Sequence, residues 1–316
     1  MSLLDRWIVH CADPLGRGAP PRRPLPIKRI GDLIDQAEAH GVLGAILQNF
    51  PPFREDPAFA AGRDAARERN RANAAFSLLL RHEADGLTAD LRDVPAAIVK
   101  GPVFARLLYP LPSLRCFTDI DILAAEEALP RIGEVLADRG FRLAETHKRE
   151  SKWLHRDNDR MMVEVQTDLI HADSLHGIVS LPYQAIAAAP EGAAAQLMVA
   201  LIHGGAHHFE RLQQVVDICQ AARALRGGAE QERFEAMVAA ANARFIAYAG
   251  LMLAARIFGE PRCRDLARAL GPVRYRLAAR LLLDRTAVMS TTDYRRMFHN
   301  WRRLDFRILI RWSSSR

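Results

Sequence analysis

Two aspartates separated by one residue form the part of this sequence best suited to metal chemistry. Asp119 and Asp121 flank Ile120 in the apolar run 118–123, which is typical of a buried strand. Side chains alternate across a strand, so both carboxylates are expected on one face. Hard carboxylate oxygens suit Mg²⁺ where it also binds substrate phosphates. The spacing therefore predicts a Mg²⁺ site for phosphoryl transfer, with Mn²⁺ as an alternative ion.

A third acid is expected to complete this site. Glu164 lies between Val163 and Val165 in a later apolar stretch that is typical of a neighbouring strand. Asp168 is the alternative third ligand if the register of that strand differs. An isolated Asp-x-Asp is common in soluble chains and is more often structural. The prediction therefore depends on the residues around the pair.

Two basic positions upstream could bind a triphosphate. Lys100 and Gly101 follow a predicted strand and precede a predicted helix, which would place a cation and a bare backbone amide near phosphate oxygens. Arg115 lies four residues before Asp119 and could add a second charge to the phosphates. Neither feature is specific alone.

A polar stripe is expected on one helix of the C-terminal half. His203, His207, Glu210, Gln214 and Asp217 fall close to one azimuth at helical spacing. A zinc protease site is excluded because no glutamate follows His203 as in H-E-x-x-H. A structural hydrogen-bond network, contact with substrate and a second metal site stay open for this stripe.

The order and spacing of these motifs resemble the DNA polymerase β-like nucleotidyltransferase superfamily, and within it the family of uncharacterised nucleotidyltransferases. The resemblance covers roughly residues 28–225. The matching elements are Val99-Lys100-Gly101, Tyr109-Pro110, Arg115 through Asp121, Val163-Glu164-Val165, and then Leu201, His203, His207, Arg211, Leu212, Asp217 and Ile218. Two positions depart from the superfamily pattern. Its common Gly-Ser pair is Lys-Gly-Pro here, and Gln166 stands where a histidine usually follows the third carboxylate.

The resemblance implies transfer of a nucleoside monophosphate from a nucleoside triphosphate such as ATP to an acceptor, with release of pyrophosphate. It implies that the catalytic and metal-binding residues are Asp119, Asp121 and Glu164. The residues expected to bind the nucleotide are Lys100, Gly101, Arg115, Thr118 and Lys152. Those expected to border the substrate cleft are His203, His207 and Asp217.

The hydrophobic pattern predicts an α+β fold in three parts. Residues 1–92 form an N-terminal helical region that packs on the core. Residues 93–180 form the catalytic core, a small mixed β-sheet with short helices. Residues 181–316 form a C-terminal helical domain.

Composition excludes several classes of protein. Hydrophobic residues make up 49% of the 316, which is globular composition, and no apolar run approaches the length of a membrane span. No apolar leader follows Met1, and the four cysteines form no C-x-x-C pair, so a reducing cytoplasm is expected. The net charge of +7 would attract polyanions. The arginines and aromatics of residues 294–316 could form a solvated helix face, cover the core or bind nucleic acid.

The acceptor stays open on the sequence alone. A small molecule, a peptide or protein, and an RNA 3′ end are all compatible with the motifs. A toxin-like transferase that acts on tRNA is the enzymatic alternative. A noncatalytic nucleotide-binding module on the same fold is the alternative from another class, since a fold does not establish an activity.

Overall fold

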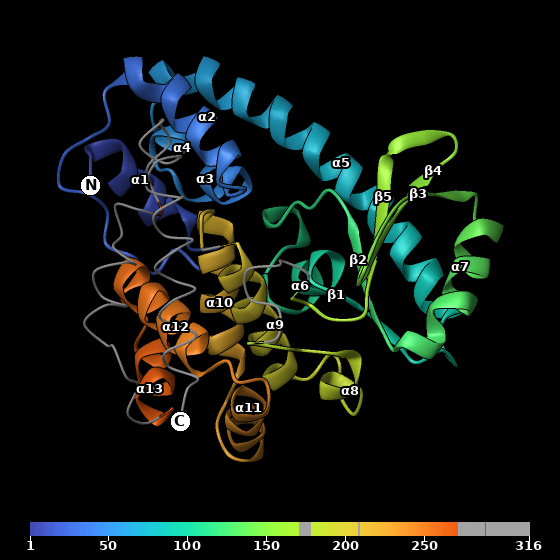
Figure 1. The fold of residues 1–316 in the computed structure, drawn as a ribbon. Helices are drawn as coiled ribbons and strands as arrows, with labels where there is room; N and C mark the ends of the chain where they lie inside the picture. The colour runs from blue at the N-terminus through green and yellow to red at the C-terminus, as the bar shows by residue number, and fades with distance from the viewer. Residues whose placement is uncertain (171–177, 208, 271–287, 289–316) are drawn as a thin grey trace.

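The computed structural model describes residues 1–170, 178–207, 209–270 and 288 of the chain. A five-stranded mixed sheet with helices against both faces adjoins a larger helical half (Figure 1). This arrangement confirms the predicted α+β class. The arginine- and aromatic-rich segment at residues 294–316 lies outside the described residues.

The sheet has the strand order β1-β2-β5-β4-β3. Its strands are β1 (Ala96–Val99), β2 (Ile120–Ala124), β3 (Phe141–His147), β4 (Glu150–His155) and β5 (Asn158–Gln166). β2 and β5 pair in parallel, whereas the other three neighbouring pairs are antiparallel. The hairpin of β3 and β4 therefore lies outside β5, and β2 and β5 occupy the interior of the sheet.

One face of the sheet is apolar and buried. Ile120, Ile122 and Val163 pack there with Leu87 and Leu136. Leu87 belongs to α5 (Ala60–Asp90) and Leu136 to α7 (Leu129–Asp138), so these two helices cover this face. The alternation along β2 and β5 then leaves the acidic side chains on the opposite face.

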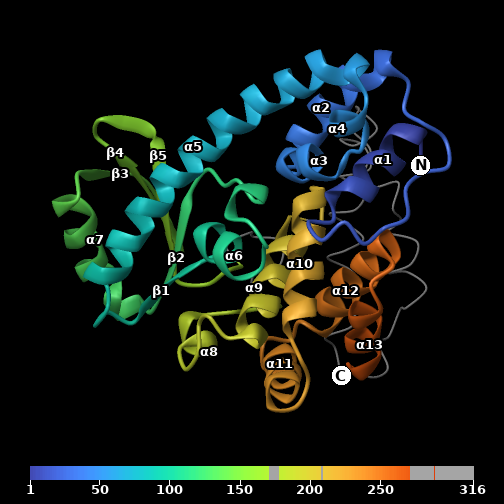
Figure 2. The same cartoon turned by 180° about the vertical axis from the view of Figure 1, so that it is seen from behind.

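The long helix α5 connects the helical half to the sheet (Figures 1 and 2). Its alanine- and arginine-rich sequence favours helix throughout its 31 residues. Its first half lies beside α2 and α3, and Leu80, Ala84 and Leu87 of its second half enter the core beneath the sheet. No described helix, α5 included, combines the length and the apolarity needed to cross a membrane.

The N-terminal and C-terminal helices share one hydrophobic core. The N-terminal helices are α1 (Leu3–Ala12), α2 (Ile30–Ala39), α3 (Leu43–Asn49) and α4 (Pro52–Glu55). The C-terminal helices are α8 (Tyr183–Ile186), α9 (Ala193–Ala206), α10 (Leu212–Ala224), α11 (Ala229–Ala240), α12 (Arg244–Phe258) and α13 (Pro261–Ala269). Helix α1 contacts both α10 and α12. The two ends of the described chain thus stabilise each other.

The strand that carries the aspartates is shorter than the sequence predicts. β2 begins at Ile120, so Asp119 lies directly before the strand instead of within it. The last residue pair between β1 and β2 joins Val99 to Asp121, because the chain turns after Val99 into α6 (Gly101–Leu107). The backbone groups of the residues before Ile120 therefore have no neighbouring strand to pair with.

Ser77 of α5 holds the segment before β2 in place through Phe117. Its hydroxyl donates a hydrogen bond to the Phe117 carbonyl and accepts one from the Phe117 amide, both at 2.9 Å. Ser77 and Phe117 are buried. The hydroxyl therefore satisfies backbone groups that no strand pairs.

We expect Ser77→Ala to lower the free energy of unfolding by about 1–3 kcal/mol, because it leaves two buried backbone groups of Phe117 without a partner. Urea unfolding followed by circular dichroism measures the change. The exposed Ser113 provides the control, since Ser113→Ala removes no buried hydrogen bond. Equal stability of the two variants would contradict the role given to Ser77.

Candidate active site

Asp121 and Glu164 lie side by side on adjacent parallel strands. The register of β2 and β5 places Asp121 opposite Glu164, and directly opposed residues share one face of a sheet. Asp119 precedes Asp121 by two residues and lies directly before β2. Asp121 is buried, whereas Asp119 and Glu164 are half-buried. The structure therefore gathers the three predicted acids at one edge of the sheet face.

The three carboxylates disfavour one another's ionised forms. Burial is the largest cause and raises the pKa of all three groups, that of Asp119 to about 6. Repulsion adds to burial: Asp121 raises the pKa of Asp119, Glu164 raises that of Asp121, and Asp119 raises that of Glu164. Such a cluster favours the arrival of a cation.

Lys100 supplies the nearest positive charge. Its ammonium Nζ lies 2.5 Å from Asp121 Oδ1, and both side chains are buried. The Lys100 backbone has φ 57° and ψ −130°, a conformation that side-chain-bearing residues rarely adopt and that costs about 1–3 kcal/mol. The turn between β1 and α6 thus holds a strained lysine whose charge lowers the pKa of the aspartates and of Glu164.

Gly101 lets this turn approach the aspartates. A Cβ atom added at Gly101 would lie 3.2 Å from the Asp119 carbonyl oxygen and 3.3 Å from the Phe117 ring. These distances are tighter than ordinary contacts, so a larger residue would push the turn away from Asp119. The predicted Lys100-Gly101 pair therefore lies beside the predicted Asp119.

Gln166 connects two of the acids. Its amide Nε2 donates hydrogen bonds to Asp121 Oδ1 at 3.2 Å and to Glu164 Oε2 at 3.3 Å. Its Oε1 atom is buried and has no hydrogen-bond partner among the described residues. An unsatisfied oxygen beside two carboxylates fits a site that is completed by a bound group.

Lys152 lies among three glutamates on the neighbouring hairpin. Its Nζ atom is 3.6 Å from Glu164, 3.6 Å from Glu150 and 3.9 Å from Glu145. These carboxylates raise the pKa of Lys152 against the opposing effect of burial, which is the largest single cause. Lys152, predicted to contact the nucleotide, thus sits next to the third acid of the cluster.

Arg115 joins the helical half to the carboxylate site. Its Nε and Nη2 atoms each donate a hydrogen bond of 2.8 Å to the carboxylate of Asp217 on α10, and Nη1 donates to the Gly101 carbonyl at 3.2 Å. The Tyr109 hydroxyl donates to the same carboxylate at 2.6 Å. Arg115, Tyr109 and Asp217 are all buried. In this structure, Arg115 therefore positions the Lys100-Gly101 turn, while its contact with phosphate stays a prediction.

The predicted polar stripe does not lie on one helix, because α9 ends at Ala206 and α10 begins at Leu212. Asp217 accepts hydrogen bonds from Arg115 and Tyr109. His203 and His207 lie at the end of α9, where their rings meet edge to face with centroids 4.7 Å apart. Contact of the histidines with a substrate stays a prediction.

Asp168, the alternative third ligand, is engaged elsewhere. Its carboxylate accepts hydrogen bonds from the amides of Ile170 and Leu181, each at 2.9 Å, and also from the Ser180 hydroxyl. These bonds link Asp168 to Ile170, Ser180 and Leu181. Glu164, not Asp168, has the position beside Asp121.

Sequence reasoning did not assign two charged residues that act on the cluster. Arg211, before α10, lowers the pKa of Asp119, and Glu150, on β4, raises that of Glu164. Glu150 lies two positions before Lys152, so alternation along a strand could have placed it on the same face. Arg211 matches the family pattern, but no role was assigned to it, because only tertiary packing brings the start of α10 near Asp119. Thr118 is exposed directly before Asp119.

The donor set fits a divalent cation, although the cation site is not preformed. Among residues 1–170, 178–207, 209–270 and 288, no three His, Cys, Asp or Glu side chains are already arranged to hold a metal ion. The three acids nevertheless supply hard oxygen donors, repel one another, and lie beside the unsatisfied Gln166 oxygen.

A family model described as uncharacterised nucleotidyltransferase matches residues 28–259 of the chain. The match contains the Lys100-Gly101 turn, the three acids and helices α9 and α10. No curated protein matched the chain. No solved structure matched it either.

Breaking the buried pair at Asp217 should strongly destabilise the chain. Asp217→Asn leaves the buried Arg115 guanidinium without its carboxylate, so we expect the free energy of unfolding to fall by about 3–5 kcal/mol. Urea unfolding gives the value. The control is Glu191→Gln, which breaks the exposed pair with Arg106 and should cost no more than about 1 kcal/mol. A similar small cost for both variants would refute the joining role of Arg115.

The raised pKa of Asp119 predicts a pH-dependent penalty. Folding raises this pKa from 3.8 to about 6, so the folded chain holds the proton more tightly and loses stability as pH rises through that window. Asp119→Asn removes the charge. At pH 7 without divalent cations, the variant should be more stable than the wild type by about 1 kcal/mol, or about 2–4 °C in Tm.

Thermal unfolding of both proteins at pH 7 and near pH 4 measures this difference. The gain should shrink at the lower pH, where the carboxylate of Asp119 is protonated in the folded chain. A gain that is the same at both pH values, or a loss at pH 7, would show that the charge of Asp119 is not unfavourable in the fold.

Proposed function

Because this chain belongs to the uncharacterised nucleotidyltransferase family, we propose that it transfers a nucleoside monophosphate from a nucleoside triphosphate to an acceptor nucleophile and releases pyrophosphate. The family supports nucleotide transfer in general. The single observation that carries the finer proposal is the pairing of Asp121 with Glu164 on neighbouring strands, with Asp119 beside them.

Asp119, Asp121 and Glu164 are the residues that would hold Mg²⁺, or Mn²⁺ in its place. When bound, such a cation makes the attacking hydroxyl more acidic and neutralises charge on the pyrophosphate leaving group. The negative charge of the carboxylates would hold this cation in the site, where it serves as counter-ion to the bound triphosphate. Their raised pKa values mean that cation binding and deprotonation favour each other.

The basic residues around the cluster would bind and orient the triphosphate. Lys100 carries the cation nearest to Asp121, and Gly101 lets its backbone approach. Lys152 is the corresponding cation beside Glu164. Arg115 keeps the Lys100-Gly101 turn in place through the Gly101 carbonyl. Fixed positive groups of this kind stabilise charge that develops on phosphate oxygens during transfer.

The acceptor is a nucleophile whose class the transfer experiment must identify. The net charge of +7 favours anionic acceptors, RNA among them, through long-range attraction. The cytoplasm, where triphosphates are available and thiols stay reduced, is the compartment that we propose. A toxin-like transferase acting on tRNA is the RNA form of this proposal.

We expect Asp121→Asn to reduce transfer by about 100-fold or more, since it removes the central carboxylate of the cluster. The protein is incubated with Mg²⁺, a cell lysate and one labelled triphosphate at a time (ATP, GTP, CTP or UTP). The lysate is then separated into RNA, protein and metabolites. Label should appear in one fraction with the wild type, and chelation of the metal should abolish it. Asp138→Asn, on the exposed side of α7, is the matched control.

Asp121→Asn also leaves the buried Lys100 without its partner, so folding is checked by circular dichroism. Glu164→Gln, at a half-buried position, gives a second test of the same cluster. Wild-type transfer by both folded variants would overturn the proposal. Binding of triphosphate without metal and without any labelled product would favour a noncatalytic nucleotide-binding module.

A further inference from the structure

A hollow of about 470 Å³ on the helical half of the molecule is lined mainly by arginines. The loop after α1, the end of α10 and the beginning of α13 border it. The residues that line this arginine hollow are Arg17, Arg223, Leu225, Arg226, Glu260 and Arg262. In Figures 1 and 2, α13 lies on the far side of α9 and α10 from the sheet, so the hollow is separate from the carboxylate site.

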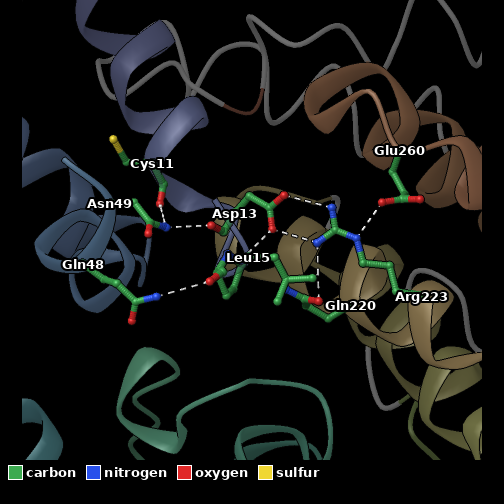
Figure 3. Close-up of polar contacts among 9 residues, drawn as sticks. Cys11, Asp13, Leu15, Gln48, Asn49, Gln220, Arg223 and Glu260 are labelled. Atoms are coloured by element: carbon green, nitrogen blue, oxygen red, sulfur yellow. Dashed lines mark hydrogen bonds and ion pairs between the residues drawn. The ribbon is translucent and has the colours of Figure 1, made fainter. Parts of the chain in front are cut away.

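Arg223 is held by two carboxylates (Figure 3). Its Nη1 and Nη2 atoms donate to the two carboxylate oxygens of Asp13 at 2.7 and 2.9 Å, and its Nε atom donates to Glu260 at 2.6 Å. The Asn49 amide donates in turn to the Asp13 carbonyl at 2.7 Å. Elements from both ends of the described chain therefore meet at this guanidinium.

Arg262 is held in a similar way. Its Nε atom donates to the Leu225 carbonyl at 2.9 Å, and Nη2 donates to Gln231 Oε1 at 3.1 Å. Both of these partners are neutral, so the Arg262 charge is oriented without being neutralised. An oriented guanidinium loses less side-chain entropy when it binds a ligand.

Arg17 and Arg226 keep their charges available. Both are exposed, and within the described part of the chain no carboxylate forms an ion pair with either of them. Burial is the largest single cause and raises the pKa of Asp13, but the hydrogen bonds and charge of Arg223, the Leu15 amide and the charge of Arg17 together lower this pKa below its usual value. Asp13 therefore stays ionised.

The charges of the hollow do not balance. The guanidinium groups of Arg17, Arg223, Arg226 and Arg262 are accompanied by two carboxylates, Asp13 and Glu260. Two of the four positive charges thus lack a counter-charge. Arg223 pairs with both carboxylates, so the charges of the other arginines are available to a ligand in the hollow.

We propose that the arginine hollow binds a phosphate group of a ligand, at a site distinct from the carboxylate cluster. Guanidinium forks match the oxygens of phosphate in shape and charge, and a phosphate monoester carries close to the two negative charges that the hollow lacks. The phosphate can come from a small polyphosphate or from the backbone of a nucleic acid. Phosphate binding at the hollow does not depend on catalysis at the carboxylate cluster.

The test compares two double variants of the full chain that lose the same charge. Arg17→Ala with Arg226→Ala removes the two unpaired cations of the hollow. Arg264→Ala with Arg268→Ala removes two exposed arginines of α13 that do not line it. Calorimetry with inorganic tripolyphosphate and fluorescence anisotropy with a single-stranded oligonucleotide are carried out in EDTA at physiological salt.

We expect the hollow variant to bind at least one probe about tenfold more weakly than the control variant, which should stay close to the wild type. Weaker binding of tripolyphosphate identifies a small phosphorylated ligand. Weaker binding of the oligonucleotide alone identifies a nucleic-acid backbone. Equal losses in the two double variants, unchanged binding in both, or no binding of either probe by the wild type would overturn the proposal.

Discussion

The parallel pairing of β2 with β5 is the constraint on which the rest of the site depends. It forces Asp121 and Glu164 onto adjacent positions of one face, where burial and repulsion both oppose their ionised forms. Positive and donating groups must therefore surround them: Lys100 beside Asp121, Lys152 beside Glu164, and the Gln166 amide between the two. The strained backbone of Lys100 is tolerated because it delivers an ammonium to this position.

The helical half is part of the same constraint. Arg115 could not hold the Gly101 carbonyl in a fixed place unless its own charge were compensated inside the protein. Asp217, on α10, provides that compensation with two hydrogen bonds, and Tyr109 adds a third bond to the same carboxylate. Because α10 packs in the core shared by the two ends of the described chain, the geometry of the turn depends on helices far from the sheet.

The sequence was informative about features of the fold and the site that depend on residues close together in the chain. Apolar runs located β1, β2 and β5, and the Asp-x-Asp spacing indicated that Asp119 and Asp121 lie together, although Asp119 comes directly before β2 and the alternation of a strand does not extend to it. Glu164 was expected on a neighbouring strand, with Asp168 as the alternative. Local patterns could not decide between these two acids, because the pairing depends on a strand order in which the β3–β4 hairpin lies outside β5. Arg115 was expected to contact a phosphate because its charge is visible in the sequence. Its pairing with Asp217 could not be foreseen, since Asp217 lies on a helix that only the tertiary fold brings near.

The arginines show why net charge alone is a weak guide to function. Arg115 and Arg223 each form paired hydrogen bonds with an aspartate from a distant part of the chain, so their charges join elements and contribute little field outside the protein. Arg17 and Arg226 pair with no carboxylate in the described part of the chain and lie in an open hollow. An anion responds to such unpaired cations, and their location selects its site more than the total of +7 does.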